Sequence, residues 1–136
     1  MTIKIALLRG INVGGRNSIP MQELRELLEE FGCRDVSTYI QSGNVVFRSD
    51  ESEAALSSHL SSAIKQRFGF EPFVLILPGD RFAAIADANP YADDDIDPKF
   101  VHVNFLASKA VEPDIDKMRE LQSKTEHFTL TDHALY

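Results

Sequence analysis

The order in which strand and helix patterns alternate along residues 1–78 constrains the fold of this chain more than any other feature. Residues 2–8 alternate and then run apolar, with several β-branched side chains, which is typical of a strand. Apolar residues then recur at helical spacing after Pro20, and Gly32 ends that helix in the usual left-handed position. Cys33 follows, and we expect it to be a small buried residue after the helix.

The pattern continues through two strands, a second helix and a fourth strand. Gly43 and Asn44 suit a two-residue hairpin turn, because both residues tolerate positive φ. Asp50 and Glu53 resemble a capping pair for the second helix, which Gly69 closes. The expected elements are strands at 36–41 and 45–48, a helix with Leu56, Leu60, Ile64 and Phe68 on one face, and a strand at 73–77. The order βαββαβ predicts a ferredoxin-like subdomain over residues 1–78, with both helices on one face of an antiparallel sheet.

A second, incomplete copy of the same pattern follows. Residues 79–98 are predicted to form a connecting helix and an acidic loop, and residues 99–136 a second ferredoxin-like subdomain. Its expected elements are a strand at 100–106, a helix marked by Ile115, Met118 and Leu121, and strands at 127–130 and 134–136. The predicted fold class is α+β: a ferredoxin-like βαββαβ sandwich followed by a truncated βαββ unit. The open sheet edge of that second unit predicts self-association.

The loop at residues 10–18 is longer and more polar than the connection of a strand to a helix requires. Its glycines permit close backbone approach, while Arg16 in the loop and Arg9 just before it supply fixed positive forks, which favours an anionic ligand. In a βαββαβ unit this loop lies at the same sheet end as the hairpin at Gly43 and Asn44. The predicted ligand-binding residues are Arg9, Asn12, Gly14, Gly15, Arg16, Asn17, Gln41, Ser42 and Asn44. We expect Arg9, at the strand end, to have a structural partner as well.

Two functions fit this cluster, and a third, catalysis, is weakly supported. In the first, the loop and hairpin bind a phosphate- or carboxylate-bearing small molecule. In the second, the same loops form a subdomain or protomer interface without any chemistry, and their glycines serve turns. The loop nearly spells a Walker motif, but Arg16 and Asn17 stand where that motif has Lys and Ser or Thr, and Pro20 delays the helix. No candidate general base lies in the cluster, so no catalytic residue is predicted.

Composition excludes several other classes of protein. Fourteen basic and 21 acidic residues give a net charge of −7, without the basic footprint of a nucleic-acid binder. Tyr39 and Phe47 are therefore expected in core or interface packing, not in base stacking. No Cys or His spacing resembles a metal site, and no motif identifies a cofactor. With one cysteine, no secretory leader and no apolar run long enough for a membrane span, the expected location is the cytoplasm.

Two long motifs carry a resemblance to a known family. They are Leu-Leu-Arg-Gly-Ile-Asn-Val-Gly-Gly at residues 7–15 and Thr-Tyr-Ile-Gln-Ser-Gly-Asn-Val-Val-Phe at residues 38–47, joined by Pro-Met-x-x-Leu at residues 20–24. With these motifs the chain resembles domain-of-unknown-function family 1697. The resemblance implies a bacterial-type cytoplasmic protein with two ferredoxin-like subdomains. It implies no activity.

Overall fold

The computed structural model describes residues 1–93 and 95–136, which form two compact units, Met1–Phe82 and Ala83–Tyr136. The predicted α+β class is confirmed. The first unit contains β1 (Thr2–Leu8), α1 (Met21–Glu30), β2 (Arg34–Tyr39), β3 (Asn44–Ser49), α2 (Glu53–Phe68) and β4 (Val74–Pro78). This is the βαββαβ order predicted from the sequence.

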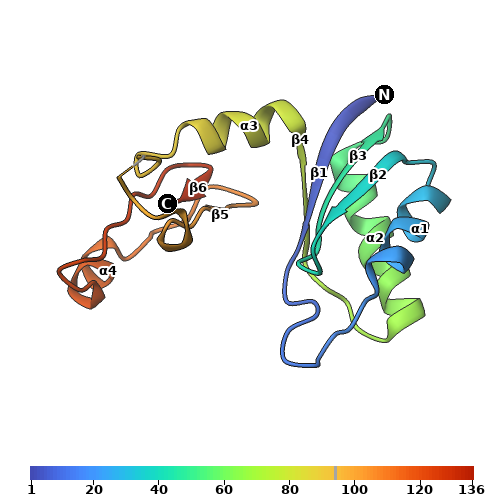
Figure 1. Ribbon diagram of the computed structural model, residues 1–136, viewed down its shortest axis with the longest axis horizontal. Coiled ribbons are helices and arrows are strands. Elements are labelled where there is room, and N and C mark those ends of the chain that lie inside the picture. The colour runs from blue at the N-terminus through green and yellow to red at the C-terminus, as the bar shows by residue number, and fades with distance from the viewer. Residues whose placement is uncertain (94) are drawn as a thin grey trace. The chain divides into compact units, whose positions relative to one another are not determined.

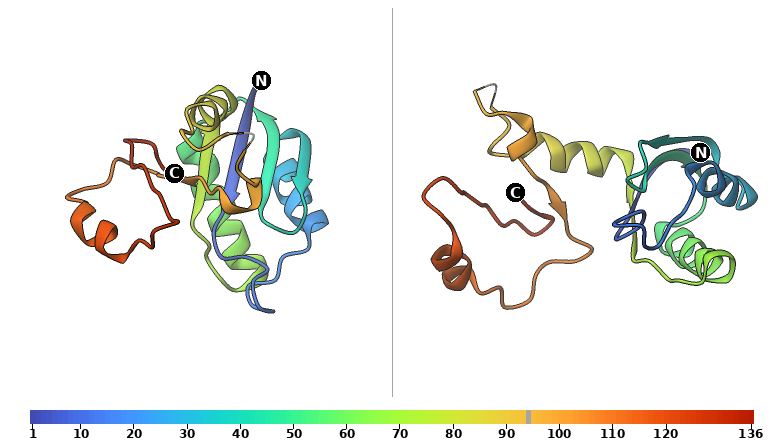
Figure 2. Two further views of the ribbon diagram at one scale, coloured as in Figure 1. Left: turned by 60° about the vertical axis from the view of Figure 1, so that its left-hand side comes forward. Right: turned by 60° about the horizontal axis from the view of Figure 1, so that its bottom comes forward.

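The four strands of the first unit form one antiparallel sheet in the order β2-β3-β1-β4. Helices α1 and α2 both cover the same face of this sheet (Figures 1 and 2). Leu8, at the end of β1, pairs with Val74 at the start of β4, while Leu7 pairs with Asn44 at the start of β3. The segments that follow β1, join β2 to β3 and precede β4 therefore lie at one end of the sheet.

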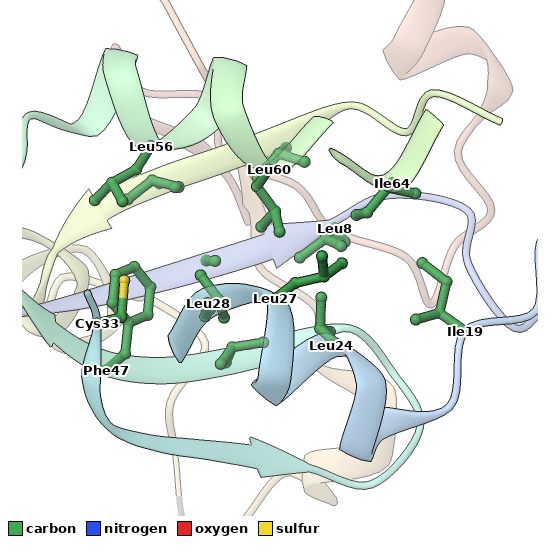
Figure 3. Packing of buried hydrophobic residues seen from close by; sticks show 14 of the residues in the cluster. Leu8, Ile19, Leu24, Leu27, Leu28, Cys33, Phe47, Leu56, Leu60 and Ile64 are labelled. Carbon is green, nitrogen blue, oxygen red and sulfur yellow. The ribbon is translucent and has the colours of Figure 1, made fainter. Parts of the chain in front are cut away.

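The core lies between the sheet and the two helices, where the side chains of α1 and α2 point toward one another (Figure 3). The predicted helical spacing is confirmed, because Leu56, Leu60 and Ile64 of α2 are all fully buried. Strand β1 alternates as predicted, and its inward side chains include that of Lys4. Cys33 is buried behind α1 and has a free thiol, as expected.

The start of α2 differs from the prediction. Ser52 is the N-cap, and its hydroxyl accepts a hydrogen bond from the Ala55 backbone N–H. Asp50 lies outside the helix, and its carboxylate binds the N-terminal ammonium of Met1 at 3.1 Å. Asp50 and Glu53 are therefore not a capping pair, because serine fills the cap position one residue before the helix. Gly69 ends α2 in the left-handed conformation, as predicted.

The β2–β3 hairpin is also longer than predicted. Tyr39 pairs with Asn44, so the turn consists of residues 40–43 and Asn44 belongs to β3. Ile40 and Gly43, at the two ends of this turn, have positive φ angles of 44° and 78°. The prediction of a two-residue turn at Gly43 and Asn44 is wrong, because the Ser42 hydroxyl closes a wider turn by donating to the Tyr39 carbonyl at 2.8 Å.

The second unit has less regular structure than predicted. It contains most of α3 (Gly79–Asp87), the 3-10 helix η1 (Pro98–Phe100), β5 (Asn104–Phe105), α4 (Ile115–Leu121) and β6 (Ala134–Leu135). The strand predicted at 100–106 is reduced to β5, and Phe100 belongs instead to η1, which Asp97 caps at its start. The predicted helix at Ile115 is confirmed. The strand predicted at 127–130 is reduced to a bridge between Leu130 and Leu135, although Thr129 and Tyr136 exchange both backbone hydrogen bonds. The predicted acidic loop, 89–98, includes Asp94, which lies outside the described residues.

Within the described residues, none of the helices is both long and apolar enough to cross a membrane.

Candidate anion site at one end of the sheet

The loop after β1 and the β2–β3 turn contact each other directly, as predicted. The Leu8 backbone N–H donates to the Gly43 carbonyl at 3.0 Å, and the Asn12 side-chain amide donates to the Gln41 carbonyl at 3.2 Å. The segment before β4 joins them, since the Arg9 N–H donates to the Phe73 carbonyl at 3.0 Å. Three connections thus form one continuous surface at the end of the sheet.

Gly14 and Gly15 form the turn of a miniature hairpin. Val13 and Arg16 pair as an antiparallel bridge, and the Arg16 N–H donates to the Val13 carbonyl at 3.0 Å. Both glycines have positive φ, as the two central residues of a type I′ turn require. The loop therefore does not form a phosphate-binding Walker loop, because α1 begins only at Met21 and its N-terminus does not follow the glycines directly.

Asn12 holds the base of this hairpin. Its Oδ1 accepts from the Ile19 N–H at 2.7 Å, and its Nδ2 donates to the carbonyls of Ile19 and Gln41. Asn12 adopts a positive φ of 54°, which asparagine tolerates better than most residues. Since the amide uses its oxygen and both of its N–H groups on the backbone, Asn12 positions the loop.

Three further polar residues of the predicted set are also bound within their own segments. The Asn17 amide donates to the Gly10 carbonyl at 3.1 Å, and the Asn44 amide donates to the Ser42 hydroxyl at 3.0 Å. Ser42 in turn donates to Tyr39. These contacts make the local geometry rigid, and they leave few polar side-chain groups of the loop for a ligand.

The guanidinium groups of Arg9 and Arg16 are different. Both arginines are exposed, and over residues 1–93 and 95–136 neither side chain has a hydrogen-bond or ion-pair partner. The prediction that Arg9 has a structural partner is therefore wrong for its side chain, since only its backbone N–H is hydrogen-bonded. Each arginine immediately precedes one of the two residues in the Gly10–Asn17 hydrogen bond, so the two chain segments that carry them run side by side. The Gln41 side chain is exposed as well.

The segments at this end of the sheet also carry large exposed apolar side chains, which the sequence did not predict. Val13, Tyr39, Ile40 and Phe73 are all more than half exposed. Tyr39 is 70% exposed and is not a core residue, whereas Phe47 is 1% exposed and confirms the prediction of core packing. The strand alternation carries this signal, because Tyr39 and Phe47 fall on opposite faces of the sheet.

The opposite end of the sheet has its own polar cluster. Lys4 is 5% exposed, and its Nζ binds the Glu53 carboxylate at 3.0 Å. The Glu53 carboxyl has a lowered pKa, because it accepts a hydrogen bond from the Glu53 backbone N–H and another from the Lys4 side chain. Burial raises the pKa of the nearby Cys33 thiol, so this cysteine is protonated and unreactive at neutral pH.

Neither end of the sheet offers a metal site. Among the described residues, no group of three or more His, Cys, Asp or Glu side chains could hold a metal ion. A shallow groove of about 490 Å³ runs between α2 and the start of β4, and neither loop arginine lines it. Ser57 and Ser61 on its wall donate to the carbonyls of Val74 and Pro72.

The comparison with known families agrees with the two motifs at this end of the sheet. A family model described as a protein of unknown function, DUF1697, matches residues 1–136, which is the whole chain. The chain belongs to the DUF1697 family. No curated protein matches this DUF1697 chain.

A solved structure resembles this DUF1697 protein over almost its full length. It is the structure of the conserved bacterial protein SP0830 from Streptococcus pneumoniae, with a TM-score of 0.72 and 29% sequence identity. The match covers 98% of this chain and 75% of that chain. The similarity supports a conserved fold.

Proposed function

We propose that this DUF1697 protein is a binding domain for a small phosphate- or carboxylate-bearing molecule, which it holds with Arg9 and Arg16. One observation carries the proposal. These two guanidinium groups are exposed and unpaired within the described residues, on a loop whose asparagines, Asn12 and Asn17, hydrogen-bond to its own backbone. A cation that folding does not require, held on a rigid turn, is well prepared to bind an anion.

The arginine forks would bind the anion in bidentate fashion. The exposed Gln41 amide would add a donor from the neighbouring turn. The backbone N–H groups of Gly14 and Gly15 are further donors, since in the described residues neither is used in the hairpin. Asn12, Asn17, Ser42 and Asn44, predicted as ligand-binding residues, act in this proposal by positioning the loop and the turn.

A thermal-shift screen with inorganic phosphate and citrate as probes tests the proposal. A ligand that binds only the native state raises the melting temperature, by an amount that grows with the logarithm of its concentration relative to its Kd. Arg16→Ala should change the free energy of unfolding by less than about 0.5 kcal/mol, so the melting temperature of the free protein should stay almost unchanged. The same variant should weaken binding by ~1.5–3 kcal/mol, as expected for a hydrogen bond to a charged group.

The matched control is Arg34→Ala, because Arg34 is another exposed arginine without a partner among the described residues, and it lies outside the loop. That variant should bind the probe as the wild type does. The proposal fails if neither probe shifts the wild type. It also fails if Arg34→Ala weakens binding of the probe as much as Arg16→Ala does.

A second candidate function is favoured by the exposed apolar side chains around the loop. A surface that combines Tyr39, Ile40 and Phe73 with unpaired arginines has the composition of a protein interface. In this alternative, the loops bind another protomer or protein and carry no small ligand. Ile40→Ser distinguishes the two functions, since it should disrupt a protein interface and leave phosphate binding intact.

The remaining parts of the proposal concern association and location. Because β5 is an edge strand of its two-stranded sheet, the second unit offers a place for pairing with another chain. We assign the protein to the cytoplasm, where a single buried free thiol such as that of Cys33 would stay reduced.

A further inference from the structure

Phe73, the residue before β4, lies directly opposite Arg9 of the proposed anion site. Leu8 pairs with Val74, and the Arg9 N–H donates to the Phe73 carbonyl at 3.0 Å, so the antiparallel ladder continues by one more pair beyond β1. Directly opposite residues of such a ladder share a face of the sheet, with Cβ atoms about 5 Å apart. The side chains of Arg9 and Phe73 therefore leave the backbone side by side, and every contact that places them lies within the first unit.

Neither of these two side chains contributes to the core. Leu8 and Val74 belong to the core cluster and are 6% and 5% exposed, so the alternation of the strands directs Arg9 and Phe73 away from it. Phe73 is 58% exposed, and over residues 1–93 and 95–136 its ring has no aromatic or cationic partner. An unpaired cation and an unpacked ring at neighbouring positions form a surface in two parts. One part suits an anion, and the other suits a flat apolar group.

The charges and the ring together indicate a class of ligand. Two guanidinium groups, those of Arg9 and Arg16, match the charge of one phosphate monoester, which is about −2 at neutral pH, whereas a single carboxylate leaves one of them without a counterion. Nucleobases stack on exposed aromatic side chains of proteins, because every base has a flat π-face. One ring and two cations suit one nucleotide. The net charge of −7 disfavours a polyanionic strand.

We propose that the ligand of the anion site is a nucleoside monophosphate. Its phosphate would bind Arg9 and Arg16, and its base would stack on the ring of Phe73. This inference rests on the proposed function, because the same two arginines bind the anionic group and Phe73 adds the recognition of the base. Tyr39 is exposed as well, but it is not part of this site, since β3 lies between its strand and β1.

Isothermal titration calorimetry of the full chain with AMP and with ribose 5-phosphate tests this inference, because the two probes share the sugar phosphate and only AMP has a base. The wild type should bind AMP ~10-fold more tightly than ribose 5-phosphate, as expected for one stacked base. Phe73→Leu keeps an apolar side chain and removes the ring. It should bring the ratio of the two affinities close to one and leave the affinity for ribose 5-phosphate unchanged.

Tyr39→Leu is the matched control, because it removes another exposed ring of the first unit, and it should keep the preference for AMP. Equal binding of the two probes by the wild type overturns the nucleotide assignment, while the anion site itself stands. Binding of neither probe overturns the proposed function and this inference together. A preference for AMP that persists in Phe73→Leu, or that is lost in Tyr39→Leu, overturns the assignment of the base to Phe73.

Discussion

Gly43→Ala tests how the loop after β1 is held against the β2–β3 turn. Two costs add at this position. A φ of +78° costs a residue with a side chain ~1–2 kcal/mol. A Cβ atom would also lie 2.8 Å from Ile11 Cδ1 and 3.1 Å from Leu8 Cβ, and overpacking of this kind costs about 1–3 kcal/mol. We therefore expect Gly43→Ala to lower the free energy of unfolding by ~2–5 kcal/mol.

Gly14→Ala is the matched control, because Gly14 has a φ of +59° and a methyl group added there would meet only open space. It should show the backbone cost alone, about 1 kcal/mol. Urea unfolding followed by circular dichroism gives both values from the midpoints at constant slope. Ile11→Val removes the nearest methyl group, so in a double-mutant cycle it should recover part of the loss in Gly43→Ala. If Gly43→Ala costs no more than Gly14→Ala, the proposed packing of Ile11 against the turn is wrong.

The remaining predictions concern single polar contacts. Asn12→Ala should lower the free energy of unfolding by about 2–4 kcal/mol, because it leaves partly buried backbone groups unpaired. In the same urea assay Asn17→Ala should cost under ~1 kcal/mol, because it loses one exposed hydrogen bond. Because the folded-state pKa of Glu53 lies below its ordinary 4.5, its contribution to stability is present at neutral pH and is lost as the pH falls through and below 4.5. Glu53→Gln should therefore make the loss of stability in acid shallower, and an unchanged acid profile would contradict this. Lys4→Met should change the neutral-pH stability by less than about 1 kcal/mol, since an apolar chain fills the same buried space and the exposed Glu53 can turn to water.

Periodicity was enough to predict the first unit from the sequence. Its apolar spacing and its two helix-ending glycines, Gly32 and Gly69, follow from local rules, and the element order leaves few topologies. The same topology predicted that the glycine loop meets the β2–β3 turn. The cap at Ser52 and the wider turn before Asn44 could not be predicted from the sequence, because several residues in the first segment can cap a helix and several in the second suit either a two-residue or a wider turn.

The site could be predicted only in part. Sequence composition does not distinguish an asparagine that binds a ligand from one that holds a loop, and Asn12 proved to be the second kind. Exposure of Tyr39 required the register of β2 against β3, since a shift of one residue would bury it. The second unit was harder, because strands such as β5 are too short to carry a period-two pattern.

The proposed anion site is tested by titrating the ¹⁵N-labelled full chain with inorganic phosphate and following the backbone amide and arginine Nε–H signals by NMR. An anion site at the two arginines predicts saturable shifts confined to Arg9, the Gly14 and Gly15 turn, Arg16 and Gln41, and their loss in Arg16→Ala. Shifts spread equally over all exposed arginines, or no shift in the loop while other residues respond, would contradict it.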